Sequence, residues 1–295
     1  MKRSSGKIGL VVDWVVDLLV RTLIAVSLWL PYDRRGPVAG WVVAHVIAPV
    51  AGYRRRVRDN LALIFPDMPK AEVERMARAV PANIGRTFLE IYSGDEFAAR
   101  VAREPLQGPG VQALEQAAAE KRPVLLVTGH FGNYDAMRAA LIARGYPVGG
   151  LYKPMKNRFF NTHYVAAISR IGTPVFPRSR SGMADMVRFL KGGGMVGIVL
   201  DHYVKGGVPL PFLGHDAITS LATAEMALRY NALVVPVYGI RRDDGRFDLL
   251  VGSPVPHSDP VTMTQALNAD LEQHVRRHMD QWMWTHRRWK TGRPG

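Results

Sequence analysis

The chain has no cysteine among its 295 residues. The absence of thiols excludes disulfide bonds, thiolate-ligated zinc and a cysteine nucleophile. The sequence also lacks a Gly-x-Ser-x-Gly nucleophile elbow, a phosphate-binding Gly-x-x-x-x-Gly-Lys loop and a histidine pair with a helper carboxylate. We therefore expect no acyl-enzyme serine hydrolase, no P-loop nucleotidase, no metal site and no bound cofactor.

Acidic residues are scarce relative to basic ones. The 25 Asp and Glu stand against 39 Lys and Arg, which gives a net charge of +14. Such an excess favours anionic partners: nucleic acid, an anionic membrane, a phosphorylated substrate or an acidic carrier protein. Basic clusters beside apolar segments, as at residues 54–58, fit a membrane surface better than a nucleic-acid groove. The alternative for each cluster is an ordinary solvated surface.

No long apolar run is free of charge. The longest, Ile8 to Leu30, is interrupted by Asp13, Asp17 and Arg21. A helix of this length reaches ~30 Å, but each charge costs roughly 2.5–3.5 kcal/mol at the centre of a membrane. The three charges recur every four residues and therefore share one helical face. We predict a membrane-anchoring helix whose polar stripe packs on the protein body or lies along the membrane surface; a buried soluble helix and a cleaved signal peptide are the alternatives.

The character of the pattern changes near residue 105. Before it, helical segments are expected at 37–50, 54–65, 70–80 and 83–92. After it, short β-branched runs alternate with helical patterns. Strands are expected at Val124–Thr128, Val148–Tyr152, Thr173–Phe176, Met195–Leu200, Leu233–Ile240 and Phe247–Val251. Helices are expected at Asn133–Ala143, Asn157–Ile171, Gly182–Lys191, Ser220–Tyr230 and Met263–Trp282.

This alternation predicts the fold class. We expect an α/β protein with a mixed, mainly parallel central sheet flanked by helices. The catalytic domain would comprise residues 105–295, and residues 1–104 would form an N-terminal membrane-associated helical segment.

The candidate chemistry follows the strand Val124–Thr128. His130 comes two residues after this strand, and a helix begins soon after it. Ligands of open α/β sheets bind outside the carboxyl ends of the strands. Asp135, in the first turn of the helix, can fold back to the imidazole, fix its tautomer and stabilise the imidazolium. The spacing thus suggests a general base with an orienting carboxylate, whose nucleophile comes from the substrate; a structural histidine with a capping aspartate is the alternative.

Longer segments carry a family resemblance. The run GHFGNYD, residues 129–135, resembles the corresponding segment of the lipid A biosynthesis acyltransferases, the lauroyl and myristoyl acyltransferase family. Further similar segments follow in the family's order: RRVRDNLALIFPDMP (55–69), NIGRTFLEIY (83–92), YKPMKN (152–157), LDHYVKGGVPLPFLG (200–214) and QWMWTHRRWK (281–290). Together they cover roughly residues 50 to 290.

The resemblance implies a reaction. A fatty acyl chain would pass from an acyl carrier protein thioester, or from acyl-CoA, to a hydroxyl of a lipid A precursor at the cytoplasmic side of the inner membrane. The family usually has Glu where this chain has Asp135, so another glycolipid or a mannoside lipid is the alternative acceptor. A non-enzymatic membrane lipid-binding protein is a further alternative, and nucleic acid is not an expected partner.

Several further residues are candidates for substrate binding. Backbone amides around Phe131 and Gly132 are possible donors to the oxyanion of the tetrahedral intermediate. Lys153 stands where the family usually has Arg, and Arg170 matches a family Arg with its spacing shifted by about two residues. The full candidate set is Phe131, Gly132, Asn133, Lys153, Arg158, Arg170 and Asp201. For the charged members, a surface charge or a turn residue is the alternative.

The C-terminal segment interleaves aromatic and basic residues. Trp282, Trp284 and Trp289 alternate with Arg287, Arg288 and Lys290. Rings beside cations suit a lipid headgroup interface, and they also suit single-stranded nucleic acid. The apolar N-terminus favours the headgroup interface.

Overall fold

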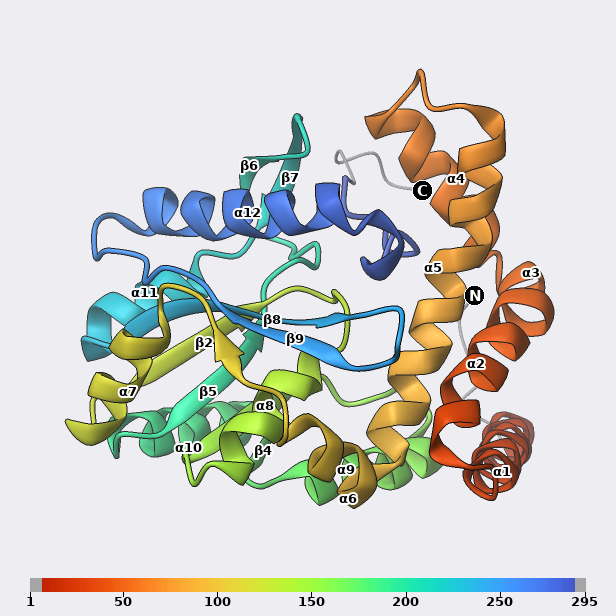
Figure 1. The fold of residues 1–295 in the computed structure, drawn as a ribbon, viewed down its shortest axis with the longest axis horizontal. Helices are drawn as coiled ribbons and strands as arrows, with labels where there is room; N and C mark the ends of the chain where they lie inside the picture. Colours follow the sequence, from red (N-terminus) through yellow and green to blue (C-terminus); the bar gives the residue numbers. More distant parts are fainter. Residues whose placement is uncertain (1–6, 290–295) are drawn as a thin grey trace.

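A seven-stranded sheet forms the centre of the computed structural model, which describes residues 7–289 (Figure 1). The strand order is β1-β9-β8-β2-β5-β3-β4, and all neighbours are parallel except β8 and β9. The strands are β1 (Leu106–Gln107), β2 (Val124–Thr128), β3 (Val148–Tyr152), β4 (Val175–Pro177), β5 (Met195–Val199), β8 (Leu233–Arg241) and β9 (Phe247–Val251). The predicted α/β fold with a mainly parallel sheet is confirmed.

Helices cover both faces of the sheet. In strand β2, the side chains of Val124 and Leu126 pack in one hydrophobic core, and those of Leu125 and Val127 pack in another. Because both faces of the strand are buried, its sequence is continuously apolar. The first core is formed with α6 (Gly94–Val101), α7 (Val111–Ala119), α8 (Tyr134–Ala143) and α9 (Arg158–Ile171). The second is formed with α10 (Arg180–Lys191), α11 (Ala222–Tyr230) and α12 (Pro260–Arg277). Helices α8 and α12 accordingly lie on opposite sides of β8 (Figure 1).

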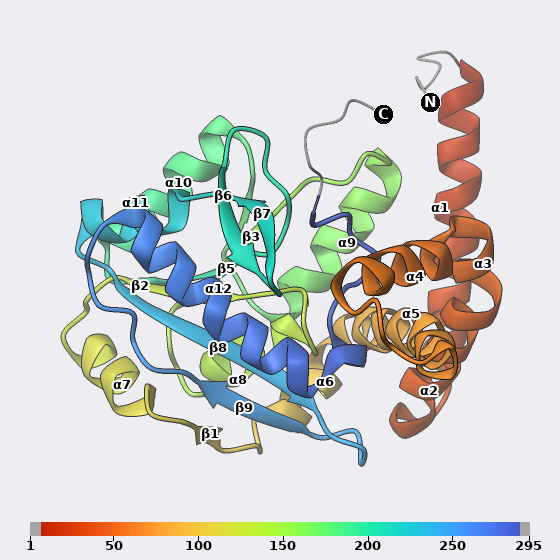
Figure 2. The same cartoon turned by 90° about the horizontal axis from the view of Figure 1, so that it is seen from above.

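The remaining helices gather at one side of the sheet (Figures 1 and 2). They are α1 (Lys7–Leu28), α2 (Tyr32–Val42), the π-helix η1 (Val43–Ile47), α3 (Ala48–Ala51), α4 (Tyr53–Ile64) and α5 (Lys70–Tyr92). Helix α5 is continuous, although two helices separated near Pro81 were predicted. Helices α2 and α5 approach closely, since a Cβ on Gly85 would lie 2.6 Å from the carbonyl oxygen of Ala39.

The N-terminal helices share a core with the α/β part. Val57 and Leu61 of α4 and Met76 of α5 belong to the same buried cluster as Phe131 and Trp282. The boundary between residues 104 and 105 stays a prediction, because this core includes residues from both sides of it.

The predicted membrane anchor is not supported by the helices of the structure. Within residues 7–289, no single helix combines the length and apolar composition needed to cross a membrane. The segments Tyr32–Ala51 and Tyr53–Ile64, bent by 82° at their junction, meet these criteria only as a pair. In α1, Asp17 of the predicted polar stripe is buried, whereas Leu19 is 65% exposed. The stripe thus faces the protein body at Asp17.

One hairpin was not predicted. Strands β6 (Val208–Phe212) and β7 (His215–Thr219) form a separate antiparallel pair. Pro209 and Pro211 made this hairpin difficult to predict from the sequence. Proline has no backbone N–H to donate, so it is tolerated in a sheet only where its nitrogen faces away from the neighbouring strand. Helices α6 and α7 and the two-residue strand β1 were also not predicted.

The predicted headgroup interface at the C-terminal segment is wrong. Trp282 and Trp284 are at most 1% exposed, Trp289 is 9% exposed, and Arg288 is fully buried. Helix α12 ends at Arg277, and after the 3₁₀ turn η2 (Met279–Gln281) the chain folds back into the core. The guanidinium of Arg288 donates to the carbonyl of Ile218 and to the hydroxyl of Thr219, so this cation fixes the hairpin β6–β7. Lys290 lies outside the described residues.

Candidate active site

Strand register brings His130 and Asp201 together. Strands β2 and β5 are parallel neighbours, with Thr128 opposite Val199. His130 and Asp201 each follow their strand by two residues, so they emerge side by side at the same edge of the sheet. Asp201 was predicted to line the cleft, and the structure places it against His130.

Three hydrogen bonds hold the carboxylate of Asp201 in place. Its Oδ1 lies 2.7 Å from Nδ1 of His130, and its Oδ2 accepts from the backbone N–H of His130 at 2.8 Å. The indole N–H of Trp282 also donates to Oδ2 at 2.8 Å. Asp201 is 2% exposed, so the contact is shielded from water.

The electrostatics of the pair define its protonation. Burial raises the pKa of the Asp201 carboxyl, but the charge and hydrogen bonds of His130 outweigh burial and hold that pKa below its ordinary range. The carboxylate is therefore ionised and accepts the proton of Nδ1. This tautomer leaves Nε2 of His130 free to accept a proton.

His130 is the first of three stacked imidazoles. The ring of His202 is parallel to it, with centroids 3.9 Å apart, and the ring of His286 lies on the other side of His202 at 4.1 Å. Burial, followed by the charge of His130, lowers the pKa of His202 to about 3, against the opposing effect of Asp201. His202 is therefore neutral at physiological pH.

A metal ion does not fit this cluster. His130, Asp201 and His202 present ligand atoms within 4.8 Å of one another. The lone pair of an imidazole nitrogen lies in the ring plane, and two rings stacked at 3.9 Å and 10° cannot both direct lone pairs at one ion. In addition, Nδ1 of His130 already binds Asp201. The group is thus better suited to proton transfer than to metal binding.

The structure corrects the expected partner of His130. Asp135 lies in the first turn of α8, where its Oδ1 binds Nε of Arg138 at 2.7 Å. Arg138 is 6% exposed and also donates to the carbonyls of Ile168 and Gly172 at the end of α9. The local reason is the i, i+3 spacing of a carboxylate and a guanidinium on one helix. Among residues 7–289, the carboxylate at Nδ1 of His130 is that of Asp201.

The loop after His130 is held by the protein itself. Phe131 is fully buried, and the Asn133 side chain caps α8 by accepting the N–H of Asp135. The N–H of Gly132 donates to the carbonyl of Gln281. The side chains of Phe131 and Asn133 therefore serve packing and capping. The amide of Gly132 is not free for an oxyanion, whereas the role of the Phe131 amide stays a prediction.

An apolar cavity opens beside His130. Its volume is about 190 Å³. Besides His130, it is lined chiefly by Val80, Ile84, Phe88, Tyr134, Met155, Tyr164, Trp282 and Met283. Helix α5 thus supplies one wall, and the buried C-terminal segment supplies another. His130 therefore borders a space suited to a hydrocarbon chain.

The three basic residues that were predicted to bind substrate do not lie together in one site. Lys153 follows β3 and its charge contributes to the lowered pKa of His202, which places it near the imidazole stack. Arg158 begins α9 and lines a separate cavity against α1. Arg170, in the last turn of α9, packs against Gly94 of α6 and lines none of the three cavities described.

Glu90 and Arg241 are functional candidates that sequence reasoning missed. Their side chains form a buried ion pair, at most 10% exposed, and Arg241 also donates to Thr87. Glu90 accepts from Asn133, and Thr87 donates to the carbonyl of Gly132. This network supports the loop of His130 from α5 and β8. A helix with a glutamate at one buried position gives no local signal of a partner 151 residues away.

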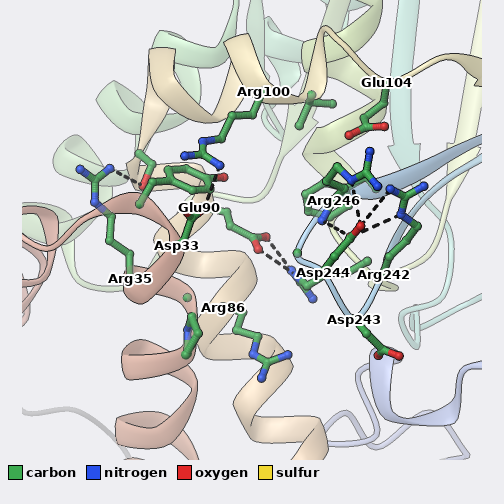
Figure 3. Close-up of a pocket in the computed structure, with 18 of the residues that line it drawn as sticks. Asp33, Arg35, Arg86, Glu90, Arg100, Glu104, Arg242, Asp243, Asp244 and Arg246 are labelled. Carbon is green, nitrogen blue, oxygen red and sulfur yellow. Dashed lines mark hydrogen bonds and ion pairs between the residues drawn. The ribbon is translucent and has the colours of Figure 1, made fainter.

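Glu90 and Arg241 also line a cavity of about 500 Å³, which does not include His130. It separates α2 and α6 from the turn between β8 and β9 (Figure 3). Among its labelled charges, Arg100 pairs with Asp33, and Asp244 pairs with Arg242 and Arg246, whereas Arg35 pairs with Glu96 of α6. The ion pairs of the described residues do not include Arg86, Glu104 or Asp243, which also line this cavity.

The comparison with known proteins covers nearly the whole chain. A family model described as bacterial lipid A biosynthesis acyltransferase matches residues 3–291. The chain is 26% identical over 242 residues to the lipid A biosynthesis lauroyltransferase of Escherichia coli (strain K12), which is 80% of this chain and 78% of that protein. It is 24% identical over 274 residues to the lipid A biosynthesis palmitoleoyltransferase of the same organism, covering 90% and 89% of the two chains.

The chain is also similar to a protein from another genus. The chain is 24% identical over 286 residues to a lipid A biosynthesis acyltransferase of Haemophilus influenzae (strain ATCC 51907 / DSM 11121 / KW20 / Rd), covering 91% of this chain and 89% of that protein. The resemblance read from the sequence segments is thereby confirmed, and the chain belongs to the bacterial lipid A biosynthesis acyltransferases.

Proposed function

We propose that this chain transfers a fatty acyl group from an acyl carrier protein thioester to a hydroxyl of a lipid A precursor, with His130 as general base. One observation carries the proposal: His130 is braced by the buried Asp201 at the edge of an apolar cavity. The names of the relatives support it, since lauroyl and palmitoleoyl transferases of lipid A biosynthesis handle fatty acyl chains. The thioester is the only co-substrate that the proposal requires.

The proposed reaction starts from the neutral imidazole. Nε2 of His130 takes the proton of the acceptor hydroxyl as its oxygen attacks the thioester carbonyl. The tetrahedral intermediate then collapses, the C–S bond breaks, and the proton passes from the imidazolium to the departing thiolate. One ester and one thiol are formed, and His130 returns to its starting state.

Asp201 acts through His130. Its carboxylate holds Nδ1–H, which keeps the reactive tautomer and orients Nε2. It also places a buried negative charge beside the imidazolium that forms during the reaction, where a low dielectric strengthens the attraction. Asp201 is thus a positioning residue for the base, and we assign this role to it in place of Asp135.

The oxyanion of the tetrahedral intermediate needs a hydrogen-bond donor. The backbone N–H groups of His130 and Gly132 are already used by Asp201 and Gln281. Lys153 is exposed and close enough to affect the pKa of His202. We assign it the role of stabilising negative charge on the thioester oxygen or on the acceptor's phosphate.

The proposed location is the cytoplasmic side of the inner membrane. Large exposed apolar side chains concentrate on the N-terminal helices, for example Leu19 at 65%, Trp29 at 86% and Val50 at 91% exposure. Such a surface suits contact with lipid, and the net charge of +14 suits anionic headgroups and an acidic carrier protein. The lipid acceptor would then reach the site from the bilayer.

The test uses purified full-length protein with an acyl carrier protein thioester and a lipid A precursor. His130→Ala should lower the rate of acyl transfer by about 10³–10⁴-fold while the melting temperature stays near that of the wild type. His215→Ala, at an exposed histidine of the hairpin β6–β7, serves as the matched control. Near-normal turnover by folded His130→Ala protein would reject the mechanism, and absence of transfer by the wild type to this acceptor would reject the acceptor.

A further inference from the structure

A cavity of about 450 Å³ lies between α1 and the first turns of α9, apart from the space at His130. It is lined by Trp14, Asp17 and Arg21 of α1 and by Arg158, Phe159 and Thr162 of α9. None of these residues lines either of the other two cavities described. Acyl transfer at His130 therefore does not account for this cavity.

Asp17 has unused hydrogen-bonding capacity there. The residue is 4% exposed, and its Oδ1 has no hydrogen-bond partner within residues 7–289. Its Oδ2 makes only a long contact of 3.5 Å to Arg21. A buried carboxylate oxygen without a donor is unfavourable, and a ligand that brings an N–H or O–H group to it would remove this cost.

Two arginines, Arg21 and Arg158, line the same cavity as Asp17. Half of the Arg21 side chain is exposed, and Arg158 lies with its guanidinium 4.9 Å from the ring centroid of Phe159. The salt bridges of the described residues leave Arg158 without a carboxylate partner. Guanidinium groups are the preferred donors to phosphate oxygens.

Apolar groups surround the charged ones. Trp14 lines the cavity and is 51% exposed, and the neighbouring Val11 and Val15 of α1 are also exposed. Tryptophan beside cations is typical of the level of lipid headgroups. The cavity thus combines an acceptor, two cations and an adjoining surface suited to acyl chains.

We propose that this cavity binds the headgroup of a membrane phospholipid that carries a primary ammonium near its phosphate. The phosphate contacts Arg21 and Arg158, and the ammonium donates to Oδ1 of Asp17. A free phosphate would leave the carboxylate unpaired and place an anion beside it. A trimethylammonium headgroup has no N–H to donate, so Asp17 discriminates against it. This lipid is distinct from the acyl acceptor, and it joins α1 to α9 at the membrane.

The experiment measures lipid binding by native mass spectrometry on the full-length protein in detergent. The probes are dioleoyl phosphatidylethanolamine, phosphatidylcholine and phosphatidylglycerol. Wild-type protein should bind phosphatidylethanolamine about tenfold more tightly than phosphatidylcholine, the ratio that one charge-assisted hydrogen bond supplies. Asp17→Asn should abolish this preference, and Arg158→Ala should weaken binding of all three lipids. Arg180→Ala, at an exposed arginine of α10, should change nothing.

Two outcomes would overturn the proposal. The first is equal binding of phosphatidylethanolamine and phosphatidylcholine by the wild type. The second is a preference that persists in Asp17→Asn protein. Acyl transfer by the same variants, measured with the acceptor in detergent, shows whether each protein is folded and keeps this test separate from that of His130.

Discussion

At the scale of single residues, the stack of imidazoles determines where a proton can reside. His202 lies 3.9 Å from His130 and 4.1 Å from His286, ring to ring. Asp201 hydrogen-bonds the ring of His130 and not that of His202. Burial and the charge of His130 hold the pKa of His202 near 3, so His202 stays neutral at physiological pH.

The lowered pKa of His202 predicts acid sensitivity. Unfolded His202 titrates near 6.5, so below that pH the unfolded state binds a proton that the folded state excludes. The contribution to stability is complete above pH 6.5 and is lost as the pH falls towards about 3. Between pH 7 and pH 5 we expect a loss of about 1–2 kcal/mol, measured by urea unfolding. If His202→Asn protein shows the same loss over this range, the assignment to His202 is wrong.

Substitution of Gly132 is expected to destabilise the loop that carries His130. Its φ is +55°, and a Cβ there would lie 2.1 Å from the carbonyl oxygen of Gly239. Gly132→Ala should destabilise the fold by at least about 1–3 kcal/mol and reduce acyl transfer, because the loop of His130 must move. Gly145→Ala is the matched control, since Gly145 has φ +85° with no atom within 4 Å of the added Cβ. Equal unfolding free energies for the two variants would contradict the steric argument.

At the scale of elements, the pair Glu90–Arg241 connects α5 and β8 to the loop of His130. Both Nε and Nη2 of Arg241 bind the Glu90 carboxylate, and Glu90 in turn accepts from Asn133. Arg241→Met should lower the unfolding free energy by about 3–5 kcal/mol, since it leaves a buried carboxylate unpaired. The double variant with Glu90→Leu should recover part of this loss. An unfolding free energy of Arg241→Met equal to that of the wild type would refute the role of the pair.

The elements also show what local sequence can predict. Strand β2 and its neighbours were predictable because buried parallel strands are continuous apolar runs. The continuity of α5 through Pro81 and the hairpin with Pro209 and Pro211 were not, since proline signals a break wherever the tertiary context is unknown. The contact between His130 and Asp201 depends on the order and register of β2 and β5, which local patterns do not contain.

At the scale of the whole molecule, the exposed apolar surface predicts where the protein binds lipid. Leu19→Glu combined with Val50→Glu should weaken sedimentation with phosphatidylglycerol vesicles by at least about tenfold, because both positions face outward from the N-terminal helices. Val261→Glu is the control, since Val261 is 44% exposed but lies on α12. Equal sedimentation of the double variant and this control would show that the N-terminal surface does not contact the membrane.

The resemblance over roughly residues 50 to 290 predicted the family, whereas the environment of the tryptophans in the C-terminal segment was predicted wrongly. Alternating rings and cations are equally compatible with a headgroup interface and with a buried segment. Only the packed structure shows that Trp282 donates to Asp201 and so belongs to the site.

In the proposed mechanism Asp201, and not Asp135, orients His130. The most direct measurement is the single-turnover rate of acyl transfer in Asp201→Asn and Asp135→Asn proteins under saturating acceptor. We predict that Asp201→Asn lowers this rate by about 10³–10⁴-fold with little change in acceptor KM. Folded Asp135→Asn protein should stay within about tenfold of the wild type, because Asp135 acts through Arg138 on the packing of α8 and α9. A wild-type rate in Asp201→Asn with a lost rate in folded Asp135→Asn protein would contradict the account.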